Sequence, residues 1–149
     1  MQRILWLCLA TAACSAFAAE SKLELKDLPP AVQKTVEQES RGAVLGKIVK
    51  EREDGVTQYE IETMRNGKHR DFNVDTAGVL LEVEEEIDLD TIPGAARAAI
   101  LKQIGEGKPG MVELLTKKSG ATSYEAAWTG KDGKKQEFQV KPDGTRTKN

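Results

Sequence analysis

The chain has 149 residues, of which 31% are charged and 5% aromatic, and its formal net charge is −2 at pH 7. Residues 19–101 are acidic, with 18 acidic and 11 basic side chains, whereas residues 102–149 carry 6 acidic and 10 basic side chains. Neither part is basic enough to predict a protein that binds nucleic acid.

Residues 1–18 are predicted to be a signal peptide. Arg3 gives a positive amino-terminal region, residues 4–13 are almost entirely apolar, and Ala16-Phe17-Ala18 has the small residues that signal peptidase requires. We expect cleavage after Ala18, with cleavage after Ala19 as the alternative. The apolar run is too short for a stable membrane span, and nothing later in the chain is apolar enough. The mature protein is therefore expected to be periplasmic or secreted, without a membrane span.

Both cysteines lie inside the predicted signal peptide. Lipoprotein anchoring at Cys14 is the alternative, which the sequence disfavours because Thr11 stands where such signals usually carry Leu or Val. Removal of residues 1–18 leaves no disulfide, no thiol nucleophile and no thiolate metal site. The mature chain must then be held together by an apolar core and a sheet.

A first structural unit is predicted over residues 28–87, after a polar lead-in at 19–27. Asp27 is expected to cap a helix that starts with Pro29 and Pro30 and ends at Ser40-Arg41-Gly42. Beyond it the apolar period changes from helical to alternating, and Asn66-Gly67 is a strong hairpin signal. The predicted strands form an antiparallel meander over residues 47–53, 56–65, 68–75 and 79–87, with Val79, Leu81 and Val83 on one face of the last strand.

A second unit is predicted over residues 88–149. Asp90 or Thr91 is expected to cap its helix, with Pro93 just inside it and an apolar stripe that runs to Ile104. Residues 105–110 are predicted to be a flexible loop, because they hold three glycines and a proline. The strands that follow are predicted at 112–117, 122–129 and 134–141, with a short and polar fourth strand at 145–149.

The two units look like copies of one another. The matching segments are Leu28-Pro29-Pro30-Ala31-Val32 with Ile92-Pro93-Gly94-Ala95-Ala96, Tyr59-Glu60-Ile61-Glu62 with Tyr124-Glu125-Ala126-Ala127, and Asp71-Phe72-Asn73-Val74 with Glu137-Phe138-Gln139-Val140. Gly78 corresponds in the same way to Gly144. We therefore predict an α+β fold of two tandem modules, each a helix packed on a four-stranded antiparallel meander sheet, with the last strand of the second module short.

The sequence shows no arrangement typical of a catalytic or cofactor site. His69, the only histidine, follows a hairpin turn, has no partner for a triad or a common metal site, and is expected to be exposed. Glu60 and Glu62 could serve as paired carboxylates, but they alternate on the outer face of an open sheet, and Glu125 repeats only the first. We predict that the protein is not an enzyme and has no cofactor, and we assign no residue as a metal ligand.

Two further features allow more than one interpretation. The acidic run comprises Glu82, Glu84, Glu85, Glu86, Asp88 and Asp90. It reads as a solvated strand face, as a docking surface for a cationic partner, or as a metal site, although the usual calcium-loop pattern is absent. Trp128 shares a strand face with Tyr124 and Ala126, which predicts a core position. A binding anchor on the sheet face is the alternative for Trp128.

The repeated unit resembles a known family. A Leu-Pro-x-Ala-Val helix start, a strand with Tyr-Glu-Ile-Glu, an Asn-Gly-Lys turn and Phe-x-Val-Asp-x-x-Gly-Val-Leu are similar to the PepSY and PepSY-like domains, especially the tandem beta-lactamase-inhibitor-like form. Residues 28–86 match well. Residues 92–144 match more loosely, since Pro142 and Asp143 stand where the first unit has Thr76 and Ala77. The resemblance carries no catalytic motif and no binding residues to this chain.

The resemblance implies an exported, non-enzymatic α+β module. Members of the family are proposed to inhibit peptidases or to act as periplasmic binding modules, and inhibitors of similar fold grip enzymes with a concave sheet. We predict a protein-interaction module with a protein partner in the cell envelope, and inhibition of a periplasmic peptidase or hydrolase as its specific form. The alternative is an envelope factor that binds ions or small ligands through the segment Glu82–Asp90.

Overall fold

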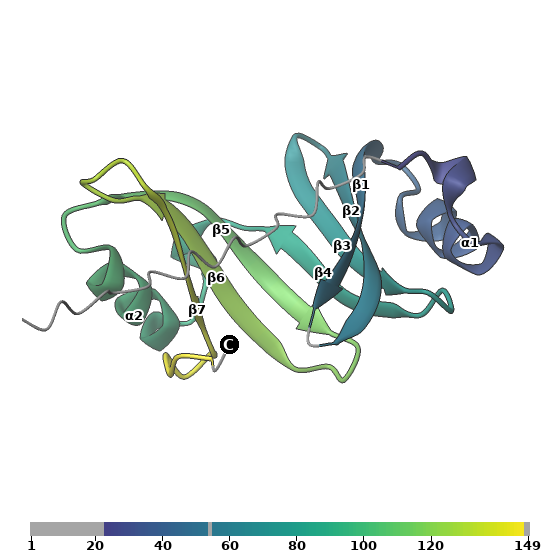
Figure 1. The fold of residues 1–149 in the computed structure, drawn as a ribbon. Coiled ribbons are helices and arrows are strands. Elements are labelled where there is room, and N and C mark those ends of the chain that lie inside the picture. The colour runs from purple at the N-terminus through teal and green to yellow at the C-terminus, as the bar shows by residue number, and fades with distance from the viewer. Residues whose placement is uncertain (1–22, 54, 148–149) are drawn as a thin grey trace, which may run out of the picture.

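The computed structural model describes residues 23–53 and 55–147, and the predicted signal peptide with Cys14 lies outside them. In these ranges seven strands form one antiparallel sheet in chain order, β1 to β7, and two α-helices pack on it (Figure 1). Along the chain the elements are η1 (Leu25–Asp27), α1 (Pro30–Glu39), β1 (Val44–Glu53), β2 (Val56–Arg65), β3 (Lys68–Asp75), β4 (Leu80–Glu86), η2 (Leu89–Thr91), α2 (Gly94–Ile104), β5 (Lys108–Lys117), β6 (Thr122–Thr129) and β7 (Lys135–Val140). The fold is therefore α+β.

Both α-helices begin directly after a proline, at Pro29 and Pro93. The predicted helix caps are wrong: Asp27 lies in the short 3-10 helix η1, and Asp90 and Thr91 lie in η2. The physical reason is that a residue before proline is kept out of the helical conformation. The helix can therefore start only at the proline or beyond it, where a missing N–H costs nothing.

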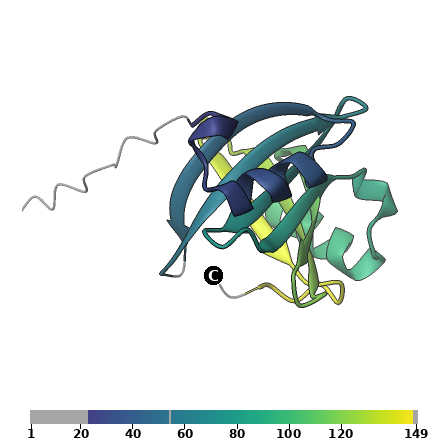
Figure 2. The same cartoon turned by 90° about the vertical axis from the view of Figure 1, so that its right-hand side faces the viewer.

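Most of the apolar core lies in two clusters, one under each helix, while Val49 and Leu115 are buried on the opposite face of the sheet. Around α1, buried Leu28, Val32 and Val36 meet Ile48, Tyr59, Ile61, Phe72 and Val74 from β1 to β3. Around α2, buried Ile92, Ala96, Ile100 and Ile104 meet Val112, Ala126, Trp128 and Val140 from β5 to β7. In Figure 2, α1 lies across one face of β1 to β4. Each predicted helix stripe is thus confirmed at its most buried positions.

Strands β4 and β5 join the two halves into one sheet, a point that the sequence left open. Their register pairs Glu82 with Lys117 and Glu86 with Glu113. Residues directly opposite each other share a face of the sheet, so this register places both core clusters, and both helices, on the same face. The helices nevertheless lie at opposite ends of the molecule on its outer sides (Figure 1). The sheet is therefore bent, with the helix-free face on the inside of the bend.

Three bulges contribute to this bend, because an extra residue in one strand kinks it and increases its twist. One lies in β1 between Leu45 and Ile48, and one lies in β5 between Pro109 and Val112. The other lies in β4, where Leu81 is the extra residue opposite Asn73 and Val74. The bulge in β4 corrects a prediction. Leu80 and Val83 pack against the first cluster, so Val79, Leu81 and Val83 do not form one apolar face.

The carboxyl-terminal half departs from its prediction at two places. The expected loop at 105–110 is half strand, since residues 105–107 form the turn after α2 and β5 begins at Lys108. Glycine makes this possible: a Cβ on Gly110 would lie 2.6 Å from the carbonyl oxygen of Ala127. The prediction of a short strand at 145–149 is wrong for the described residues 145–147. There, a single isolated bridge joins Arg146 to Val140. The second half therefore supplies three strands.

Candidate functional site

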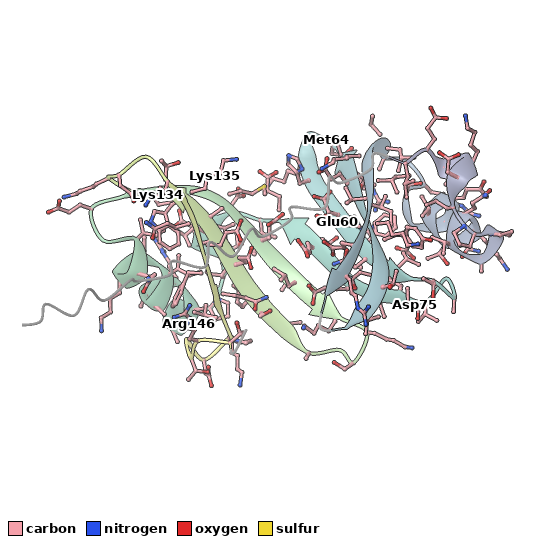
Figure 3. The ribbon with its side chains drawn as sticks, in the orientation of Figure 1. Glu60, Met64, Asp75, Lys134, Lys135 and Arg146 are labelled. Carbon is pink, nitrogen blue, oxygen red and sulfur yellow. The ribbon has the colours of Figure 1, made fainter. Side chains whose placement is uncertain are left out.

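The inner, helix-free face of the sheet collects carboxylates from five neighbouring strands. Each is placed there by strand alternation, because its sequence neighbours point into the core on the other face. We call this surface the acidic face and define it by Glu60, Glu62, Asp71, Glu82, Glu84, Glu86, Glu113 and Glu125, from β2 to β6. Figure 3 shows Glu60 on the inside of the bend, between the two helix-bearing ends.

Several of these carboxylates lie directly opposite one another on paired strands. The register pairs Asp71 with Glu84, Glu86 with Glu113, and Glu113 with Glu125. Like charges in directly opposed positions destabilise a sheet. The acidic face is therefore not explained as a contribution to folding.

The protonation of the acidic face reflects this crowding. Burial, together with the negative charges of Glu113, Glu82, Glu125 and Glu60, raises the pKa of Glu84 to about 8. Burial and the carboxylates of Asp71, Glu125 and Glu86 raise the pKa of Glu113 to about 7. Burial is also the main cause that raises the pKa of Glu60, Asp71 and Glu125. At neutral pH the free protein therefore holds protons on this face.

Few positive groups offset the acidic face. Lys117 Nζ lies 3.6 Å from a Glu82 carboxylate oxygen, and His69 Nδ1 lies 3.8 Å from an Asp71 oxygen. The charge of Lys47 also lowers the pKa of Glu60, against the larger effect of burial. In the described ranges, no ion pair reaches Glu84, Glu113 or Glu125. Among the described residues, the face thus has more hydrogen-bond acceptors than donors to pair with them.

Asn73 adds a neutral acceptor to the same surface. It lies on β3 directly opposite Glu60 on one side and Glu82 on the other. Its side chain is only 8% exposed, and its Oδ1 atom has no hydrogen-bond donor among the described residues. A buried acceptor without a partner costs on the order of 1–3 kcal/mol. Its place between two glutamates indicates that a donor is missing at this point.

A shallow hollow of about 530 Å³ continues the inner face toward β7. Ala127 and Glu137, which face each other across β6 and β7, lie in its wall, and Ala127 follows Glu125 on the same face of β6. Met111 also lines it and is 37% exposed. The rest of the wall is Pro109, Gly110, Trp128, Thr129 and Lys135, the last of which is labelled in Figure 3. The hollow offers an apolar patch beside the carboxylates.

The predicted acidic run is divided between the two faces of β4 and the segment that follows its carboxyl end. Glu82, Glu84 and Glu86 share the inner face. Glu85 points to the covered face, 3.5 Å from Arg70 Nε. Asp88 pairs with Lys68 at 3.1 Å, and Asp90 pairs with Arg97 at 2.7 Å. No group of three or more His, Cys, Asp or Glu in the described residues could hold a metal ion.

The other candidate residues have mixed outcomes. Glu60, Glu62 and Glu125 lie on the acidic face, where the bend brings them together with β4; the sequence suggested only an open surface. His69 is not an exposed turn residue, because it lies within β3, is half-buried, and its backbone N–H donates to a Glu86 oxygen at 3.0 Å. Trp128 is 6% exposed and packs in the cluster under α2, which confirms the core interpretation.

Asp71, Asn73 and Glu113 were missed as members of a site. Because these three residues alternate with apolar Phe72, Val74 and Val112, the sequence could have indicated that they lie on the polar face of the sheet. The register between β4 and β5, which sets Glu113 beside Glu86, has no signal in a single sequence.

Comparisons with known proteins support the fold. No protein-family model matches the chain, and no curated protein matches it significantly. A crystal structure of a Bacteroides eggerthii protein, predicted to be periplasmic, has a TM-score of 0.64 at 15% identity, over 81% of this chain and 86% of that one. A DUF2874 family protein from Bacteroides ovatus has a TM-score of 0.60 at 15% identity, over 81% and 85%.

A third solved structure carries a more specific description. A BLIP-like protein from Bacteroides fragilis has a TM-score of 0.54 at 18% identity, over 81% of this chain and 84% of that one. At this level of identity the likeness concerns the fold alone. In the described ranges, no helix is both long and apolar enough to cross a membrane. The chain therefore has a BLIP-like fold, as expected from the resemblance, while the PepSY relation and the tandem repeat stay predictions.

Proposed function

We propose that the protein is an exported, non-enzymatic binding module that holds a protein partner of the cell envelope on its acidic face. The observation that carries this proposal is the set of directly opposed carboxylates on the inside of a bent sheet, such as Glu86 beside Glu113. Such an arrangement lowers the stability of the free protein. Proteins commonly retain costly arrangements where function requires them.

Export is supported by the predicted signal peptide at residues 1–18 and by the likeness to the Bacteroides eggerthii protein that is predicted to be periplasmic. Inhibition of a peptidase or hydrolase is the specific form of the proposal. It is supported by the likeness to a BLIP-like protein and by the inward bend of the sheet. The alternative, ion binding by the segment Glu82–Asp90, is weakened because Glu85, Asp88 and Asp90 each pair with a basic side chain outside the acidic face.

We also propose that the chain is a tandem of two PepSY-like modules, 28–87 and 88–149. Two matching close contacts support this division. A Cβ on Gly78 would lie 2.5 Å from the carbonyl oxygen of Ala31, and a Cβ on Gly144 would lie 2.6 Å from that of Ala95. Ala31 and Ala95 occupy equivalent places in the predicted repeat, as do the two glycines. In both halves the turn after the third strand therefore rests directly on the helix.

Site-specific photo-crosslinking tests the proposed function. A photoreactive residue at Glu62, on the acidic face, is compared with one at Glu37, which is exposed on α1. In cells that export the protein, we expect the Glu62 position to form an adduct with a defined envelope protein and the Glu37 position to form none. Adducts only from Glu37, equal adducts from both, or none from either would contradict the proposal.

A further inference from the structure

We infer that the acidic face receives an extended loop of the partner protein that carries Lys or Arg side chains and, next to them, one apolar side chain. This inference rests on the proposed function and specifies the chemistry of its partner. Three observations lead to it: uncompensated carboxylates, a buried acceptor without a donor, and an apolar hollow on the same face.

The first observation is the excess of hydrogen-bond acceptors. Glu84, Glu113 and Glu125 have no ion pair in the described ranges, although each lies near other carboxylates. Lys and Arg side chains carry several donors and no acceptor. They are also long enough to reach carboxylates set back from the surface, such as Glu113, which is 8% exposed, while the loop backbone stays at the surface. A loop with such side chains would relieve the repulsion among the glutamates that lowers the stability of the free protein.

The second observation fixes a position within this surface. Oδ1 of Asn73 is buried, has no donor among the described residues, and lies between Glu60 and Glu82 in the sheet. Because Oδ1 has almost no exposed surface in the free protein, a partner's donor reaches it only when a neighbouring side chain moves aside. A donor placed there would satisfy the amide oxygen and both carboxylates together. A cationic side chain fits this place better than a neutral one, because charge-assisted hydrogen bonds are roughly twice as strong.

The third observation is the hollow beside Met111. Its wall continues along β6 from Glu125 through Ala127, so a single extended segment can contact the carboxylates and the hollow together. Exposed methionine suits variable apolar partners, since its side chain is unbranched and adaptable. The hollow therefore provides the place for an apolar anchor, whereas the glutamates select the charge of the loop around it.

A bare divalent cation is a less suitable occupant than a basic loop. The described residues offer no group of three or more His, Cys, Asp or Glu with a suitable geometry for a metal ion. The carboxylates are instead spread in opposed pairs over five strands. Separate side chains on one loop can meet them at several points, which a single ion cannot.

The experiment is a selection of loops on a rigid scaffold, from a library in which basic, acidic and neutral residues are equally frequent. The target is the protein as exported and purified. We expect the enriched loops to carry Lys or Arg next to an apolar residue. The affinity of the enriched loops for the double variant E84Q/E113Q should be at least about tenfold lower than for the original protein, because the basic side chains of the loops lose charged partners. Their affinity for the variant Met111→Ser should be severalfold lower.

The matched control is the double variant E37Q/E106Q, which removes the same charge from exposed positions outside the acidic face. Its affinity for the enriched loops should stay within about twofold of the original, since exposed charges away from an interface contribute little. Thermal melting of every variant verifies folding. E84Q/E113Q should melt no lower than the original protein at pH 8.

Enriched loops without basic residues, or loops that bind E84Q/E113Q as tightly as the original protein, would overturn the inference. A neutral loop that still loses affinity on Met111→Ser would place a partner on this face and leave the proposed function standing. The proposed function itself fails only if crosslinking from Glu62 gives no specific adduct. The two failures are therefore distinguishable.

Discussion

The two faces of the same sheet differ in what their side chains do. On β3, Phe72 and Val74 are buried under α1, whereas Asp71 and Asn73 between and beside them face the inside of the bend. β2 repeats this division with Ile61 and Glu60. The covered face gains free energy from apolar burial, and the inner face loses some through opposed carboxylates. On β2 and β3, residues that stabilise the fold thus alternate with residues of the proposed binding surface, whereas β1 and β5 also bury Val49 and Leu115 on the inner face.

The sharpest test of this division is truncation on the covered face. Phe72→Ala removes the largest fully buried side chain and should lower the free energy of unfolding by about 3–5 kcal/mol, because it leaves a cavity under α1. Glu62→Gln, on the inner face of the adjacent strand, is the matched control and should change it little. Urea denaturation followed by circular dichroism measures both. Similar losses in the free energy of unfolding from Phe72→Ala and Glu62→Gln would contradict the division between the two faces.

The second largest effect is expected where the covered face touches the helix. Gly78→Ala places a Cβ 2.5 Å from the Ala31 carbonyl oxygen at a backbone φ of +82°, so both a clash and a left-handed conformation oppose it. The loss should be about 2–4 kcal/mol, of which about 1–2 kcal/mol comes from the conformation. Gly120→Ala has a similar φ of +81° but no atom within 4 Å, and isolates the conformational part.

Gly144→Ala extends this measurement to the second half. It has a φ of +81° and a comparable close approach to Ala95. If the two halves are equivalent modules, its loss in free energy should equal that of Gly78→Ala within about 0.5 kcal/mol, the usual scatter for independent sites. A loss no larger than that of Gly120→Ala would argue against equivalence.

A smaller effect is expected from pH, and it concerns the inner face alone. The pKa of Glu84 is raised to about 8 and that of Glu113 to about 7, above their value in the unfolded chain. Between these pKa values the folded state therefore binds more protons than the unfolded state. The contribution of Glu84 and Glu113 to the free energy of unfolding is greatest below about pH 4.5 to 5 and is lost as pH rises through 7 and 8. Melting temperature should fall between pH 5 and pH 9.

Glu84→Gln should remove part of this pH dependence. At pH 9 it should raise the free energy of unfolding by on the order of 1–2 kcal/mol once solvent screening of the half-buried carboxylate is allowed for, and at pH 5 it should change it little. Glu37→Gln, on the exposed side of α1, is the control. A Glu84→Gln effect that is the same at both pH values would show that Glu84 acts through packing rather than charge.

Sequence reasoning reached the local structure but not the site. Alternation predicted a strand over residues 68–75, and Asn66-Gly67 correctly marked a turn, because both features depend on a few neighbouring residues. The helix caps at Pro29 and Pro93 were misassigned by two or three residues, since capping by Asp27, Asp90 or Thr91 competes with the constraint before proline. Element existence was thus more predictable than element boundaries.

The acidic face was not predictable as a unit. It requires the β4–β5 register, which pairs residues from the two halves of the chain, and the bulges, which bend the sheet. Neither leaves a local pattern: the extra residue at Leu81 looks like an ordinary apolar strand position. The sequence could show that Glu82, Glu84 and Glu86 share a face, but not that Glu113 and Glu125 complete it.

The smallest expected effect on stability concerns Asn73, where a role in stability and a role in binding can be measured separately. Asn73→Leu replaces a buried amide whose oxygen has no donor with an apolar side chain of similar size, so the free energy of unfolding should stay within about 1 kcal/mol of the original or rise. The same variant should weaken the basic loops selected above, because it removes the acceptor between Glu60 and Glu82. Urea denaturation and titration of a labelled loop measure the two effects. A loss of stability beyond about 2 kcal/mol would mean that the amide supports the sheet. Asn73 would then belong with Phe72 and Val74 in function, although it lies on the opposite face.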